Sequence, residues 1–153
     1  MTAAVIVRPV RREDQAEWRP LWDGYNAFYE RAGPTALPEA VTAATWARFF
    51  DAYEPVHALV AEADGRLVGL AHYLFHRTTT RIEPSCYLND LFTDPAFRGG
   101  GGGRALIDAV FAAAADVGVA GVYWMTHETN HTAMKLYDRV ATRSGFLRYV
   151  KSR

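Results

Sequence analysis

The chain has 153 residues, 50% of them hydrophobic and 13% aromatic, which is enough for a folded core and excludes a disordered chain. Seventeen basic residues balance seventeen acidic ones, which argues against a broad basic surface for nucleic acid. No apolar run reaches transmembrane length, and a single cysteine, Cys86, excludes an intrachain disulfide. We therefore expect one domain over residues 1–153 in a reducing cytoplasm, with no membrane or nucleic-acid partner.

The first half of the chain predicts a strand, two helices and two further strands, in that order: residues 4–10, 18–29, 38–50, 57–62 and 66–75. The first helix carries aromatic and aliphatic residues at helical spacing, and Gly33-Pro34 ends it. Asp64-Gly65 lies between the last two runs and favours a tight hairpin.

The second half predicts a strand, a helix, a strand, a helix and a final strand: residues 86–92, 102–117, 122–126, 130–143 and 146–150. Thr129 or Asn130 suits the N-cap of the last helix, and Ser144-Gly145 ends it. The full order is β-α-α-β-β-β-α-β-α-β. This order predicts an α/β protein with a mixed sheet and helices on both faces.

Between the strand over 86–92 and the next helix lie five consecutive glycines: Gly99, Gly100, Gly101, Gly102 and Gly103. Glycine is unfavourable in a helix by about 1 kcal/mol per residue, so five together indicate that bare backbone is needed there. A Gly loop at a helix N-terminus favours anions, because its N–H groups and the helix dipole attract negative charge. The pattern predicts a pyrophosphate site. It lacks the dinucleotide fingerprint, and it lacks the Lys-Ser/Thr ending that a nucleotide phosphotransferase needs.

Two motifs resemble those of the GCN5-related N-acetyltransferase (GNAT) family, closest to its histone/polyamine branch and bacterial relatives. Arg98, Gly101 and Gly103 meet R-x-x-G-x-G. The second motif, N-x-x-A-x-x-L-Y followed by G-F, is met by Asn130, Ala133, Leu136-Tyr137 and Gly145-Phe146. The resemblance covers residues 86–150 and implies the GNAT fold, a mostly antiparallel sheet that splays at the cofactor site.

The resemblance also implies an acetyl-CoA-dependent N-acetyltransferase that acts on a primary amine. The cofactor would be held by the glycine loop with Arg98 and Arg104, by the backbone of Leu91, Phe92 and Thr93, and by Asn130 and Ala133. Tyr137 would be the general acid toward the leaving thiolate. Asn130, Ala133 and Tyr137 fall on one helical face, in agreement with these roles.

The general base is the least determined role. Asp90 lies beside the expected acetyl position, with Glu83 and Glu128 as neighbours, but a structural acid paired with an arginine fits Asp90 equally well. Asn89 occupies a position where the polyamine branch often has an acid, and asparagine is not a base. As general base, Asp90 would then take the proton through a bridging water molecule.

Tyr29-Glu30 ends the first helix, where relatives bind substrate, so Glu30 is a candidate partner for a substrate ammonium. A solvated helix-end acid is the other interpretation. The five histidines lack the spacing of a metal site, so no metal is expected.

The apolar segment 146–150 suggests a homodimer, as in relatives of this branch. A non-catalytic acyl-CoA-binding or sensing module is the alternative function, although Asn130 and Tyr137 together favour an enzyme. Polyamines, amino acids, aminoglycoside-like amines and protein lysines all remain as acceptors.

Overall fold

A computed structural model describes residues 4–153, whose strands form one five-stranded sheet in the order β1-β2-β3-β4-β5. The strands are Ile6–Pro9 (β1), Val56–Ala63 (β2), Arg66–His76 (β3), Ser85–Thr93 (β4) and Val122–Tyr123 (β5). The helices are Gln15–Phe28 (α1), Glu39–Arg48 (α2), Gly102–Asp116 (α3) and His131–Val140 (α4), with 3-10 turns at Arg12–Asp14 (η1), Gly33–Thr35 (η2) and Pro95–Phe97 (η3). The α/β fold with a mixed, mostly antiparallel sheet is thus confirmed, since only β4 and β5 pair in parallel.

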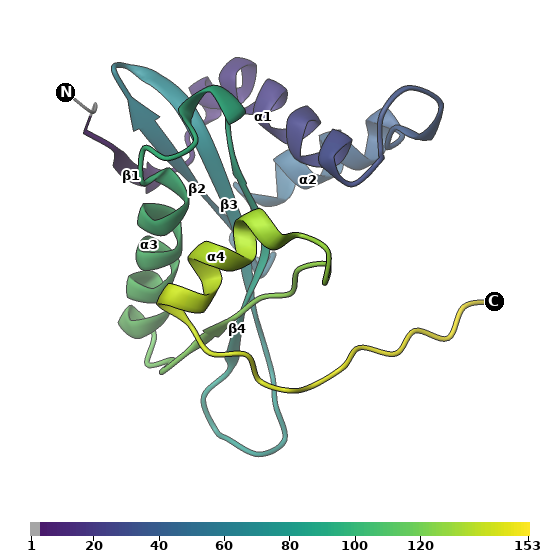
Figure 1. Cartoon of the computed structure of the whole chain (residues 1–153), viewed down its shortest axis with the longest axis vertical. Helices are drawn as coiled ribbons and strands as arrows, with labels where there is room; N and C mark the ends of the chain where they lie inside the picture. Colours follow the sequence, from purple (N-terminus) through teal and green to yellow (C-terminus); the bar gives the residue numbers. More distant parts are fainter. Residues whose placement is uncertain (1–3) are drawn as a thin grey trace.

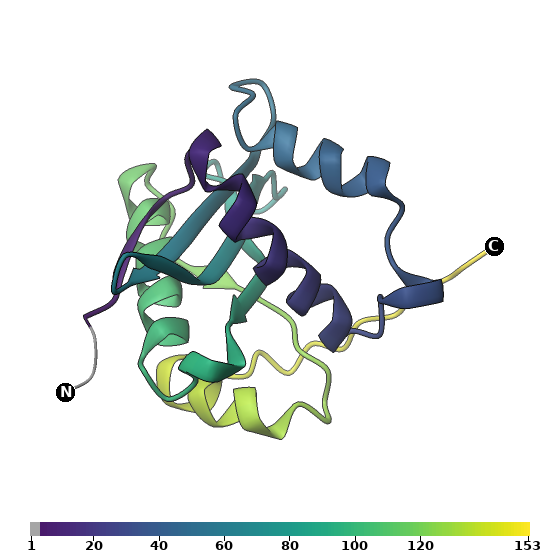
Figure 2. The same cartoon turned by 90° about the horizontal axis from the view of Figure 1, so that it is seen from above.

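Helices cover both faces of the sheet, with α1 and α2 on one side and α3 and α4 on the other (Figures 1 and 2). Strand alternation divides the core accordingly. Leu59 and Ala61 of β2 join the cluster around α3, whereas Val60 between them joins the tryptophan-rich cluster of α1 and α2. The inner strands are therefore buried on both faces and carry long apolar runs.

The hairpin between β2 and β3 turns at the predicted dipeptide. Asp64 and Gly65 both have positive φ, 50° and 75°, as a type I′ turn requires. Cys86 is fully buried in β4, and burial raises the pKa of its thiol to about 11, so it is not an activated nucleophile.

The expected final strand over 146–150 does not form within this chain. Residues 141–153 have no regular structure and run away from the domain (Figure 1). Phe146 and Tyr149 are each 90% exposed. A strand needs a neighbouring backbone, and within residues 4–153 this segment has none. The strand expected over 122–126 is also shorter, because only Val122 and Tyr123 pair with β4.

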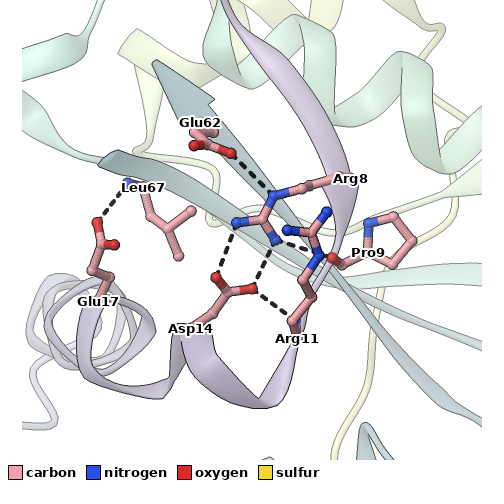
Figure 3. Close-up of polar contacts among 7 residues, drawn as sticks. All are labelled: Arg8, Pro9, Arg11, Asp14, Glu17, Glu62 and Leu67. Carbon is pink, nitrogen blue, oxygen red and sulfur yellow. Dashed lines mark hydrogen bonds and ion pairs between the residues drawn. The ribbon is translucent and has the colours of Figure 1, made fainter. Parts of the chain in front are cut away.

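A buried ion pair fixes the N-terminal strand to the first helix (Figure 3). Arg8 of β1 donates to both carboxylate oxygens of Asp14, at 2.8 and 2.9 Å, and to Glu62 of β2 at 3.0 Å. The Arg11 backbone N–H also donates to Asp14, at 2.7 Å. These hydrogen bonds, with that of Arg8 the largest, hold the pKa of Asp14 below its ordinary value.

No helix in residues 4–153 is both long and apolar enough to span a membrane. The placement of the protein in the cytoplasm stays a prediction.

Asp14→Asn is expected to lower the free energy of unfolding by about 2–4 kcal/mol at pH 7, because it breaks a buried pair and leaves Arg8 undercompensated. Folding lowers the pKa of Asp14, so its contribution is present above its unfolded pKa of about 3.9 and is lost as pH falls through the lower folded value. Denaturant unfolding at pH 7 and pH 3 measures this. Asp23→Asn, which removes an exposed pair with Arg19, is the control and should cost about 0–1 kcal/mol. An equal loss for both variants at pH 7 would contradict the assignment.

Candidate active site

A gap in the sheet opens between β4 and β5. The two strands pair only at Cys86 with Val122 and at Tyr87 with Tyr123. Beyond this point β4 continues to Thr93 without a partner on that side, while the other side stays paired with β3. Backbone groups of the second half of β4 therefore face the opening, which is the splay that the sequence resemblance implies.

The glycine loop leads from the end of β4 into α3. Gly101 is the N-cap of α3, and the first ladder bond runs from the Ala105 N–H to the Gly101 carbonyl. No side chain caps this end in the described chain. The N–H groups of Gly102, Gly103 and Arg104 thus lie outside the helix ladder and point out of its N-terminus. They form the kind of donor set that binds phosphate.

Glycine is needed in this loop for two separate reasons. Gly99 and Gly101 adopt left-handed φ values of 83° and 82°, which disfavour other residues. Gly102 and Gly103 pack so closely that an added Cβ would lie 3.3 Å from Thr93 and from Leu136, respectively. The bare backbone therefore lets the start of α3 pack closely against both β4 and α4.

Helix α4, which follows β5 in the chain, carries Tyr137. Asn130 is its N-cap, as predicted, but its side chain donates to Thr126 Oγ1 at 3.0 Å instead of capping the helix. Tyr137 is partly buried and packs edge-on against Trp124 at 5.5 Å. Burial, with a smaller effect of Tyr29, raises the pKa of Tyr137 to about 12. The hydroxyl therefore stays protonated at neutral pH, as a proton donor must.

A buried hydrogen-bond network surrounds Asp90. His72 Nδ1 lies 2.8 Å from Asp90 Oδ2, and Asn89 Nδ2 donates to Oδ1 at 2.7 Å. Trp18 Nε1 donates a hydrogen bond to His72 Nε2 at 3.1 Å, so Nε2 is unprotonated. The imidazole proton is therefore on Nδ1, which donates a hydrogen bond to Asp90. Burial alone would raise the pKa of Asp90, but the hydrogen bonds from His72, Tyr25 and Asn89 outweigh it and hold the pKa below its ordinary value.

A β-bulge at Asn89 orients Asp90. His72 pairs with Asp90 and Tyr73 pairs with Leu88, so Asn89 is the extra residue of β4. Leu88 packs in the cluster around α3, while Asp90 meets the ring of His72 beneath α1. Residues two apart in a regular strand share a face, so the bulge is what sends Asp90 to the α1 side.

A cleft of about 410 Å³ lies on this α1 side, bounded by α1, α2, the start of β2 and the middle parts of β3 and β4. Its polar lining includes Asn26, Arg31, Asn89 and Asp90, and its apolar lining includes Leu37, Val41 and Phe49. The cleft has space and chemistry for a small polar ligand.

The predicted residues gather in two groups. The glycine loop, Thr93 and α4 surround the splay, and Asp90 lies in the cleft of the α1 side. Arg98 lines a second cleft, of about 370 Å³, between α1 and the end of β4. Arg104 is exposed and lies 3.9 Å from Asp108.

Two other predicted positions lie at the end of α1. Tyr29 contacts Tyr25 edge-on at 5.2 Å and is close enough to Tyr137 to affect its pKa. Glu30 is exposed, has a φ of 62° and is absent from the lining of the cleft.

Sequence reasoning missed two residues of the cleft. His72 is the direct partner of Asp90, although an arginine was the expected partner for a structural acid there. Arg31, next to Glu30, lines the cleft in its place. The sequence signal for Arg31 was its position directly after the predicted substrate-binding pair. In residues 4–153 no cluster of three or more potential metal ligands occurs.

Comparisons with known proteins agree with this geometry. A model of the acetyltransferase (GNAT) family matches residues 18–141. A D-amino-acid N-acetyltransferase of Saccharomyces cerevisiae is 33% identical over 150 residues, covering 97% of this chain and 91% of that protein. An aminoglycoside N-acetyltransferase solved with CoA has a TM-score of 0.82 at 18% identity, covering 100% of this chain and 97% of that one. A ribosomal-protein-alanine N-acetyltransferase from Brucella melitensis has a TM-score of 0.78 at 21% identity, covering 98% and 100%.

The protein is therefore an acetyltransferase. The chain belongs to the GNAT family, as its glycine loop and last helix predicted.

Gly101→Ala is expected to lower the free energy of unfolding by about 1–2 kcal/mol, because it forces a Cβ into left-handed backbone. Space is not the cause, since nothing lies within 4 Å of the added Cβ. Gly121→Ala is the matched control, with equal space and no positive φ. Denaturant unfolding compares the two variants, and equal stability would contradict the strain argument.

Proposed function

We propose that this protein transfers the acetyl group of acetyl-CoA to a primary amine of a small molecule or peptide by direct attack. The observation that carries the proposal is the splay of the sheet. Its parts are the unpaired N–H groups at the start of α3 and the free side of β4, with Tyr137 on α4, the helix whose Leu136 packs near Gly103. A pyrophosphate, a pantetheine arm and a thioester need such groups in that order.

In this proposal the first turn of α3 binds the pyrophosphate, with the other loop glycines and the guanidinium groups of Arg98 and Arg104 at its margin. Bare backbone supports this role, because side chains at Gly102 and Gly103 would meet Thr93 and Leu136. The free backbone of Leu91, Phe92 and Thr93 pairs with the amides of the pantetheine arm like an added strand. Asn130 and Ala133 line the opposite wall on α4.

Tyr137 is proposed to donate its hydroxyl proton to the departing thiolate. Its raised pKa, about 12, supports this role because the phenol stays protonated over the working pH range. Acetyl-CoA supplies the activated acyl group when it is bound. A backbone N–H near Phe92 is proposed to stabilise the oxyanion.

Asp90 is proposed to attract the acceptor amine. An alkylammonium has a pKa of about 10.4 and must lose a proton before it attacks. The lowered pKa of Asp90 makes it a weak base but keeps it ionised, and a carboxylate has lone pairs beyond those used by His72 and Asn89. We therefore assign it the role of an anionic anchor, with the proton leaving through water. Tyr29 would line the acceptor side, and Glu30 would attract the ammonium group of the acceptor from the rim.

We also propose a cytoplasmic homodimer in which the segment 146–150 of each protomer pairs with the partner. Support comes from its four apolar side chains, Phe146, Leu147, Tyr149 and Val150, each at least 67% exposed in the single chain. Apolar area of this kind is costly to leave in water.

Tyr137→Phe is expected to lower kcat by about 100-fold or more and to leave CoA affinity unchanged, because it removes only the proton donor. Thiol release from acetyl-CoA measures turnover, with a panel of polyamines, amino acids of both hands, an aminoglycoside and a lysine-rich peptide. Calorimetry measures CoA binding.

Tyr53→Phe is the control, since Tyr53 is 98% exposed and far from the splay in the chain. Unchanged turnover in Tyr137→Phe would remove Tyr137 from the mechanism. CoA binding without thiol release for any acceptor would favour the sensing module, and no CoA binding would overturn the cofactor site.

Ending the chain after Ser144 is expected to convert a dimer to a monomer, because it removes the exposed apolar segment. Light scattering during size exclusion gives the mass of both proteins. The double variant Phe146→Ser, Tyr149→Ser keeps the chain length and should act in the same way. A full-length chain that elutes as a monomer would contradict the dimer.

A further inference from the structure

We infer that the acceptor carries a carboxylate and that Arg31 binds it. This inference rests on the proposed function and deepens it by naming the substrate class. It selects amino acids and similar zwitterions over polyamines and aminoglycosides, which are purely cationic.

Arg31 is held in a defined position at the end of α1. Its Nε donates to Asn26 Oδ1 at 2.7 Å. Asn26 is only 4% exposed and is itself fixed by a hydrogen bond from Nδ2 to the Trp22 carbonyl, at 2.9 Å. The guanidinium also lies over the rings of Tyr25 and Tyr29, 5.7 and 5.4 Å from their centroids. Little side-chain freedom remains to be lost when a ligand binds.

The hydrogen-bonding groups that matter are still free. In residues 4–153, no carboxylate lies within ion-pair distance of Arg31, and its two Nη groups have no hydrogen-bond partner. Arg8 and Arg19, in contrast, each contact two carboxylates. A pair of terminal N–H groups in a fixed plane matches a carboxylate in the bidentate manner.

Arg31 and Asp90 line the same cleft with opposite charges. Tyr25 lies between them, with its hydroxyl beside the Asp90 carboxylate and its ring beneath the guanidinium. An acceptor whose ammonium faces Asp90 and whose carboxylate faces Arg31 satisfies both groups at once. A polycation would instead bring a second positive charge toward Arg31, which disfavours it.

The remaining walls accept a side chain. Leu37, Val41 and Phe49 belong to the apolar lining of the cleft. Arg48 also lines it, but lies 3.9 Å from Glu54 and is 52% exposed, so it is a less defined carboxylate partner. The cleft therefore suits an amino acid with an apolar side chain.

The test compares phenylalanine with phenylalaninamide, in which a neutral amide replaces the carboxylate, each as both enantiomers. Wild-type protein should have the lower KM for phenylalanine. Arg31→Gln should raise that KM by roughly 10- to 100-fold, the loss expected for a charge-assisted pair, and should change neither kcat nor the KM for the amide. Arg31→Lys should recover part of the loss, because it restores the charge but not the bidentate geometry.

Arg12→Gln is the matched control. Arg12 also lies over an aromatic ring, that of Phe50 at 4.6 Å, but is outside the lining of the cleft. It should leave both KM values unchanged.

A wild-type enzyme that acetylates both compounds with equal KM would overturn the inference and leave the proposed function intact. An equal effect of Arg31→Gln on both compounds would overturn it too. If no acceptor is acetylated, the proposed function fails instead, and calorimetry of the same two compounds in the presence of CoA still tests Arg31. In that case tighter binding of phenylalanine, lost in Arg31→Gln, would support the inference, and equal affinities would overturn it.

Discussion

The early separation of β4 and β5 is the constraint on which the rest of the site depends. Two paired residues join these parallel strands, and the remaining backbone of β4 is left open on one side. An interior strand with unpaired backbone is unfavourable unless a ligand or water satisfies it. The glycine loop continues β4 into α3, and α4 follows β5, so both elements adjoin the separated strands, and Gly103 packs against Leu136 of α4.

The bulge at Asn89 couples this opening to the other face of the sheet. It places Leu88 in the core around α3 and Asp90 under α1, so β4 serves both the cofactor side and the acceptor side. The hydrogen bond from His72 of β3 to Asp90 stabilises the bulge in β4. Trp18 of α1 in turn donates a hydrogen bond to the other ring nitrogen of His72. A short register irregularity thus brings a carboxylate into a cleft that regular alternation would have left without Asp90.

Much of the fold followed from local pattern. Helical spacing in α1, the Asp64-Gly65 turn and the glycine loop before α3 depend on near neighbours, and all are present. The segment 146–150 has a strand's composition but no partner in its own chain. Composition records a preference for extended backbone, whereas a strand also needs a second strand, which local sequence does not supply.

The sequence by itself determined the family, the place of the glycine loop before α3 and the helix face that carries Asn130, Ala133 and Tyr137, because each is a short motif with a local physical cause. Only the tertiary structure decided that Asp90 is paired with His72, 18 residues away, and that Arg31 shares its cleft. These relations depend on strand register and on the packing of α1 over the sheet. Contacts of that kind depend on the whole fold, so a short segment of sequence does not predict them.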